Sequence, residues 1–171
     1  MAYKYTSDTF QISAIVAESA PNTPTTTTIN INLDSLSREI LVIQMVDLDL
    51  SAPSLEAGFK TQLDLSLTDS NTGVSGLSNG QTIATANKTV LCGSGAGAGG
   101  IDAATSFSNQ EPLFANMDDA PIFVSATDDL FLSIAGANNT APGLGQCRIY
   151  ARRARADADT YAAILTSQFN S

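Results

Sequence analysis

Apolar and polar residues alternate along most of the chain, which is the period of a β-strand. The pattern predicts strands at 9–18, 25–33, 38–50, 63–67, 83–92, 122–124, 130–134 and 147–151. Clusters of Gly, Pro, Asn and Asp separate these segments, and such residues favour turns. Strands at this spacing without intervening helices indicate an all-β antiparallel sandwich or barrel, and of these we expect a jelly-roll-like β-sandwich.

The segment 38–50 is the most hydrophobic of the chain. Ile40–Ile43 is apolar at every position, so both of its faces should be buried, in the middle of a sandwich or beneath a partner. The second half alternates strictly, with Asp47 and Asp49 on the polar side. The alternative is a helix over 38–46, which the β-branched residues disfavour.

The period changes near the C-terminus, where apolar residues fall on one face of a short α-helix predicted over 159–169. Asp157 or Asp159 would cap its first turn. A helix of this length is not stable alone, so its apolar stripe should dock on the body of the protein or on a neighbour. The residues of this docking stripe are Tyr161, Ile164, Leu165 and Phe169.

The length of 171 residues suits a single domain with a sizeable core. We expect one β-sandwich domain over 1–171, with an N-terminal arm over 1–8, a Gly-rich loop excursion over 93–119, and the C-terminal helix and tail over 156–171. The stretch Gly93–Gly100 matches the glycine spacing of a dinucleotide-binding loop, but no amphipathic helix follows it. It is therefore predicted to be a flexible linker, extended or ordered only by a neighbour.

Charged residues make up 15% of the chain, against a usual ~25%. Thr, Ser, Asn, Gly and Ala take their place, which suits a protein whose outer surfaces face other subunits. The net charge of −9 is unevenly distributed, because residues 1–147 carry 15 acids and 4 bases while residues 148–171 carry 2 acids and 4 bases.

The only concentration of positive charge is the candidate basic patch Arg148, Arg152, Arg153 and Arg155. Three interpretations remain open for it. The arginines would pair with carboxylates of a neighbouring copy, of which Asp118/Asp119 and Asp128/Asp129 are nearest in sequence; they would bind a polyanion; or they would be a solvated edge.

Little in the sequence points to catalysis. The chain has no histidine, the commonest general base and a common metal ligand. Cys92 and Cys147 form no C-x-x-C pair, and whether they bond to each other is left open. The pairs Asp47/Asp49, Asp118/Asp119 and Asp128/Asp129 lack the spacing of a calcium loop, so solvated carboxylates are the simpler interpretation. We expect no enzyme activity, no cofactor, no metal and no small-molecule substrate.

The N-terminus lacks the apolar core of a signal peptide, and no stretch approaches the ~20 apolar residues of a membrane span. The sequence therefore predicts a soluble protein without a signal peptide or transmembrane segment.

In its strand spacing over 9–151 and its basic patch, the chain resembles the single jelly-roll coat proteins of icosahedral viruses and the β-sandwich auxiliary proteins of phage heads. The resemblance implies a structural virion protein, a capsid subunit that is assembled in the host cytoplasm with copies of itself and with other virion proteins. It also implies contact with nucleic acid or an internal membrane through the arginines. The chain departs from many coat proteins, which place a basic arm at the N-terminus, because residues 1–8 hold only Lys4.

Two other classes are weighed against the coat protein. One is a secreted or cell-surface β-sandwich that serves in adhesion or carbohydrate binding, although the chain has no Trp and only 6% aromatic residues. The other is an enzyme that works with carboxylates alone.

Overall fold

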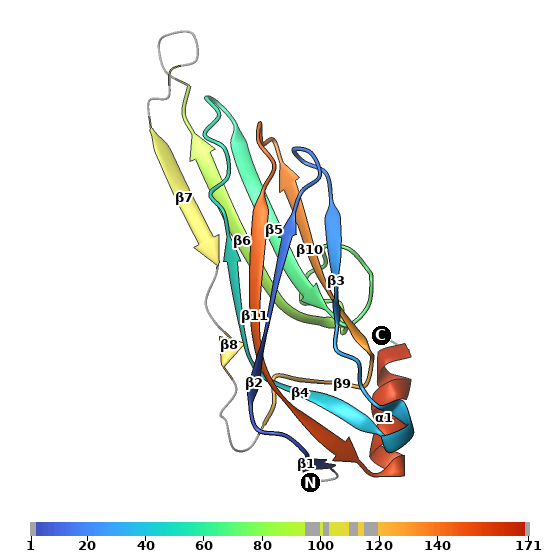
Figure 1. Cartoon of the computed structure of the whole chain (residues 1–171). Helices are drawn as coiled ribbons and strands as arrows, with labels where there is room; N and C mark the ends of the chain where they lie inside the picture. Colours follow the sequence, from blue (N-terminus) through green and yellow to red (C-terminus); the bar gives the residue numbers. More distant parts are fainter. Residues whose placement is uncertain (1–2, 95–99, 101–102, 110–112, 115–119, 170–171) are drawn as a thin grey trace.

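The computed structural model describes residues 3–94, 100, 103–109, 113–114 and 120–169. In this part of the chain two antiparallel β-sheets pack face to face, and one α-helix, α1 (Ala158–Phe169), lies at the C-terminal end (Figure 1). The predicted antiparallel β-sandwich with a short C-terminal helix is confirmed.

Each sheet has long central strands and shorter ones at its edges. Sheet A is centred on β11 (Leu144–Ala156) and β4 (Glu39–Leu50). β2 (Phe10–Ala17) and β1 (Tyr3–Tyr5) pair with β11, while β8 (Leu113–Phe114) and β9 (Phe123–Ser125) pair with β4. Sheet B has the order β3 (Thr25–Asn30), β10 (Asp129–Ala137), β5 (Lys60–Thr68), β6 (Thr82–Cys92) and β7 (Ala104–Asn109).

The strand pairing is nested from the ends of the chain inward. The early strand β2 pairs with the last strand β11, β3 pairs with β10, β4 pairs with β9, and β5 pairs with β6 in the middle. The chain crosses between the sheets after β2, β3, β4, β9 and β10, whereas β5 and β6 follow each other within sheet B (Figure 1). Nested pairing of this kind across two sheets is the jelly-roll arrangement.

The core lies between the sheets and is formed by the inward half of each alternating strand. Leu63, Leu65 and Leu67 of β5 are almost completely buried, and Leu132 and Ile134 of β10 lie opposite the last two in the register. The strands of sheet A contribute Leu41, Ile43, Val46, Leu48, Cys147, Ile149 and Ala151 from the other side.

A β-bulge at Gln44 changes which residues of β4 face the core. Tyr150 lies opposite Met45 and Ala151 lies opposite Ile43, so Gln44 is an extra residue. Such a residue shifts the side-chain parity of its strand. Leu41 and Ile43 therefore face the core before the bulge, whereas Val46, Leu48 and Leu50 face it afterwards.

A second, smaller apolar cluster lies on the outer side of sheet A, between this sheet and α1. We call it the outer cluster; its buried members are Ile40, Val42, Ala126, Ala154 and Ala156, with Tyr3, Tyr5, Val124, Tyr161, Ile164 and Leu165 packed against them. The two-sided apolar run Ile40–Ile43 is thus buried by sheet B on one face and by the protein's own helix on the other. No partner is needed to cover it.

The structure differs from the sequence prediction in two segments. Within the 93–119 excursion, 104–109 forms strand β7 and 113–114 forms β8. Within the 1–8 arm, Tyr3–Tyr5 forms β1 and is held on β11. β1 and β8 are too short, and β7 has too few apolar residues, for a strand period to be visible in the sequence. Most of Gly93–Gly100 lies outside the described residues.

Candidate functional site

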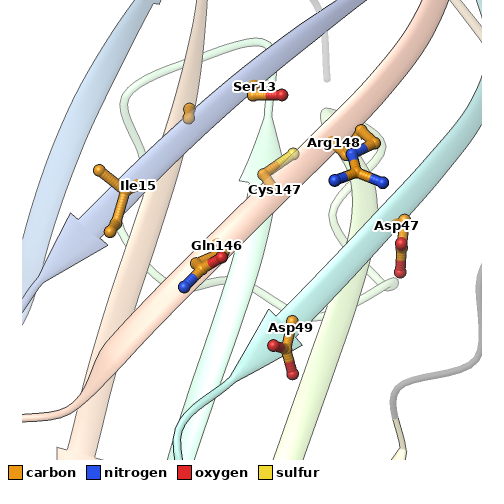
Figure 2. Close-up of a pocket in the computed structure, with 8 residues that line it drawn as sticks. Ser13, Ile15, Asp47, Asp49, Gln146, Cys147 and Arg148 are labelled. Carbon is orange, nitrogen blue, oxygen red and sulfur yellow. The ribbon is translucent and has the colours of Figure 1, made fainter.

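The outer face of sheet A carries a shallow polar hollow of about 400 Å³ on β2, β11 and β4. Ser13, Arg148 and Asp47 form one row across the three strands, and Ile15, Gln146 and Asp49 form the next (Figure 2). These residues are the outward half of the alternating strands whose other half builds the core. The hollow is therefore a direct product of the sandwich pattern.

Charge complementarity organises this hollow. Arg148 lies directly opposite Asp47 in the register, and opposite charges at this spacing stabilise an antiparallel pair. Cys147 lies beneath the hollow with its side chain in the core. Burial, followed by the negative charge of Asp47, raises the pKa of the Cys147 thiol to about 12, so it remains protonated at neutral pH. A protonated, buried thiol is not a nucleophile.

The open question of the cysteines is answered by their positions. Cys147 belongs to sheet A and Cys92 to sheet B, and both are buried free thiols. The two residues therefore act as small apolar core side chains.

Arg152 lies on the same outer face as Arg148, nearer the N-terminus. Its guanidinium lies 4.9 Å from the centre of the Tyr5 ring, and its Nε donates a hydrogen bond of 3.0 Å to the Thr9 hydroxyl. Tyr5 is itself in edge-to-face contact with Tyr3, at 5.8 Å between ring centres. The N-terminal strand therefore holds this arginine in place by cation–π and hydrogen-bond contacts.

Arg153 is engaged entirely within the chain. It forms an ion pair of 2.7 Å with Glu39, and it donates to the backbone carbonyl oxygens of Ile31 and Asn32 at 2.8 and 3.2 Å. These contacts join β11 to the segment that leads from β3 into β4. None of the three interpretations of the basic patch fits Arg153, whose contacts are those of a structural residue.

Arg155 is exposed and lies on the opposite face of the strand from Arg152. Its neighbours in the register are Lys4 and Glu39. Hydrogen bonds from Ser37 lower the pKa of the nearby Asp34 carboxyl, and the charge of Arg155 adds to this effect. Four arginines that follow each other in sequence are thus divided between two faces and do not form one patch.

The structure brings two further bases to this end of the sandwich. Lys4 lies opposite Arg155 on β1, and the carbonyl oxygen of Arg38 accepts from the Ala156 N–H at 3.1 Å. Neither residue is adjacent to the arginines in sequence, so their position at this end of the sandwich is known only from the strand pairing. We call Lys4, Arg38, Arg152, Arg153 and Arg155 the basic end.

Helix α1 begins at a cap and ends at a buried polar contact. The Asp157 carboxylate accepts from the Thr160 N–H at 2.8 Å, and these hydrogen bonds with Thr160 lower the pKa of Asp157. At the other end Gln168 is buried, and its Nε2 donates to Asp69 at 2.7 Å. Burial raises the pKa of the Asp69 carboxyl. The helix is therefore fastened to the loop after β5 as well as to sheet A.

The predicted docking stripe of α1 packs inward. Tyr161, Ile164 and Leu165 all contact the outer cluster, while the side chain of Phe169 lies outside the described part of the chain. The stripe thus docks on the protein's own body, which was one of the two alternatives.

No group of three or more His, Cys, Asp or Glu side chains that could hold a metal ion occurs in the described ranges. Asp118 and Asp119 lie outside those ranges, and Asp128 is exposed. Within the part of the chain that the structure describes, no helix has the length and apolar character needed to cross a membrane.

Comparison with known proteins adds little to this picture. No family model and no curated protein matches the chain. A structure of the tailspike protein of Acinetobacter baumannii phage AM24 is similar over 80% of this chain, at 9% identity and a TM-score of 0.19. A chain from the structure of infectious bursal disease virus, Gt strain, is similar over 91%, at 11% identity and a TM-score of 0.23. The protein spans 26% and 37% of those two chains, and likenesses at these TM-scores carry no argument about function.

Proposed function

We propose that this protein is a structural subunit of a virus particle, which associates with copies of itself through its β-sandwich to form a shell. The observation that carries the proposal is the nested strand pairing, in which β2, β3, β4 and β5 pair with β11, β10, β9 and β6. Jelly-roll sandwiches are used by viral capsid proteins, and also by lectins and cupins.

The surface of the sandwich favours the shell subunit over a ligand-binding protein. Ligand sites are usually concave and lined by apolar and aromatic side chains. The hollow on sheet A is open, carries Arg148 beside carboxylates, and has no aromatic residue in its lining. The low content of charged residues supports surfaces that face other subunits.

Size measurement tests this function directly. We expect the molar mass of the purified protein, measured by light scattering from low to high micromolar concentration, to rise well above the 17.8 kDa monomer. Electron microscopy of the large species should show closed or regular particles. A strict monomer in several buffers would contradict the proposal, and glycan-array binding by such a monomer would favour the adhesion or carbohydrate-binding class.

We further propose that the exposed arginines bind a phosphate-bearing partner in the particle, either the genome or an internal membrane. Arg148 and Arg155 are exposed, and Arg152 is half-buried with its Nε bonded to Thr9, whereas Arg153 forms an ion pair and two further hydrogen bonds within the chain. Arginine is suited to phosphate because its planar fork donates two parallel hydrogen bonds.

The triple variant Arg148→Gln, Arg152→Gln, Arg155→Gln is expected to form particles of normal size that lose nucleic acid or membrane. The exposed charges of Arg148 and Arg155 contribute only ~0–1 kcal/mol each. Arg152 also loses its contacts with Tyr5 and Thr9, so a small loss of monomer stability is expected. The measurement is the ratio of absorbance at 260 to 280 nm and the phospholipid content of purified particles. Lys60→Gln, an exposed base on sheet B, is the matched control. Loss of particles in the absence of nucleic acid and lipid would instead assign the arginines to contacts between copies.

A further inference from the structure

Strand β7 is the outermost strand of sheet B, and among the described residues no other strand lies beside its free edge. All six of its residues are exposed, which is true of no other strand whose burial is described. In the described residues, β6 is its only neighbour in the sheet. A sheet edge of this kind presents unpaired backbone groups to other chains.

The hydrogen bonds of β6 define which groups of β7 point outward. Gly93 donates to the Ala103 carbonyl oxygen at 2.8 Å, whereas Cys92 donates to Phe59 on the β5 side at 3.1 Å. Successive residues of an antiparallel strand bond to opposite neighbours. In the register of β6 with β7, the backbone groups of Thr105, Phe107 and Asn109 therefore face β6. Those of Ala104, Ser106 and Ser108 face away from it.

The outward groups are arranged symmetrically about Ser106. In an antiparallel pair of two β7 strands centred there, Ser106 lies opposite Ser106, and Ala104 lies opposite Ser108 on both sides. These three pairs would exchange about six backbone hydrogen bonds. The strand contains no charged residue, so two copies of a protein with a net charge of −9 would meet here without opposing like charges.

We propose that β7 pairs with β7 of a second copy about a two-fold axis at Ser106, which joins two copies of sheet B edge to edge. The inference rests on the proposed function, because it identifies one contact through which the copies associate. Phe107, 56% exposed, and Leu91, 43% exposed, lie on the same outer face of the sheet beside this edge. Pairing would cover part of their apolar surface.

The other edge of sheet B is less suited to this role. Unlike β7, β3 is not exposed along its whole length, because Ile29 and alternate residues before it face the core. A contact of β7 with β3 of the next copy would also be heterologous and would not close into a pair. Cysteine cross-linking at position 106 separates this arrangement from the two-fold pair.

Cysteine cross-linking tests the axis. Ser106→Cys would place two thiols on strands about 5.5 Å apart at their Cα atoms, within the range of a disulfide. Cys92 and Cys147 are buried and would not compete. We expect Ser106→Cys to form a disulfide-linked dimer under mild oxidation. Ser108→Cys alone should not, since its two copies would lie about 14 Å apart, but it should cross-link when mixed with Ala104→Cys.

Proline substitution tests the hydrogen bonds. Ser106→Pro removes an outward N–H that has no use within the chain, and proline is tolerated at such edge positions. We expect the variant to keep the monomer's melting temperature and to dimerise at least about tenfold more weakly, because two hydrogen bonds of the pair are lost. Ser106→Thr keeps the N–H and is the matched control, with unchanged dimerisation.

The outcomes separate this contact from the proposed function. Wild-type assembly with no Ser106→Cys dimer and no effect of Ser106→Pro would overturn the β7 pair while the shell subunit stands. Assembly that Ser106→Pro weakens, without the Ser106→Cys dimer, would replace the two-fold pair with β7 against another strand. Cross-linked dimers without larger particles would support the pair and contradict the shell.

Discussion

Replacing Ile40 with Ala is expected to lower the free energy of unfolding of the monomer by about 2–5 kcal/mol. Ile40 has no exposed surface, although it lies on the outer side of sheet A. Helix α1 covers it, through Tyr161, Ile164 and Leu165. Removing three carbons there costs their transfer free energy and leaves a cavity beneath the helix.

Chemical denaturation at a protein concentration that keeps the chain monomeric would measure this change. Leu41→Ala is the comparison, because Leu41 is equally buried but faces sheet B. Leu91→Ala, at a 43% exposed position, is the control and should cost less than about 1 kcal/mol. If Ile40→Ala had little effect on the monomer but weakened assembly, a neighbouring copy and not α1 would cover this face.

The two faces of β4 illustrate what the sequence could predict. Four consecutive apolar residues indicated burial on both sides, and that was correct. The pattern could not identify what covers each side, because the covering groups come from β5, β10 and α1, far away in sequence. The bulge at Gln44 could not be predicted either. An extra residue in an apolar run leaves no visible mark in the sequence, although it changes which side chains of the strand face the core.

The candidate basic patch shows how far the sequence could predict the site. Positions along β11 alternate between two faces, so adjacent arginines cannot share one surface. Arg148 and Arg152 point outward, while Arg153 reaches Glu39 and two carbonyl oxygens on the other side. The strands that pair with β11 determine which arginine has a contact within the chain. A count of charges along the sequence does not reveal which strands these are.

Strand β7 was missed for a different reason. Its six residues include no charge and only one large apolar side chain, so no alternation is visible. It is a strand because β6 provides an open edge beside it, and tertiary context of this kind regularly outweighs local propensity. The same features that hid β7 from the sequence pattern leave it exposed for pairing.

Glu18 is a structural residue that no pattern in the sequence indicated. It is 4% exposed at the end of β2, and its carboxylate accepts the backbone N–H of Gly136 at 2.7 Å and of Gly143 at 2.8 Å. These two residues flank the turn between β10 and β11. A side chain at position 136 would lie 2.9 Å from Glu18 Oε1, so glycine there makes room for the carboxylate.

Replacing Glu18 with Ala is therefore expected to lower the free energy of unfolding by about 3 kcal/mol, because two N–H groups lose a charged acceptor and are left without a partner. Glu18→Gln should cost less, since one oxygen remains to accept. Glu56→Ala is the matched control at the same end of the sandwich. Its carboxylate accepts only the Thr140 hydroxyl, in an exposed hydrogen bond of 2.7 Å, and its loss should cost about 0.5 kcal/mol.

Thermal and urea unfolding of the three variants would check this order, and hydrogen exchange would locate the effect. In Glu18→Ala the amides of Gly136 and Gly143 should lose their protection, while those of Leu65 and Leu67 in the core should keep most of theirs. Equal stability of Glu18→Ala and Glu56→Ala would mean that water replaces the carboxylate at both amides. The turn between β10 and β11 would then be held by its other hydrogen bonds, among them those of the Asn139 side chain, which donates to the Gln62 carbonyl oxygen at 2.8 Å and accepts from the Ser54 N–H at 3.0 Å.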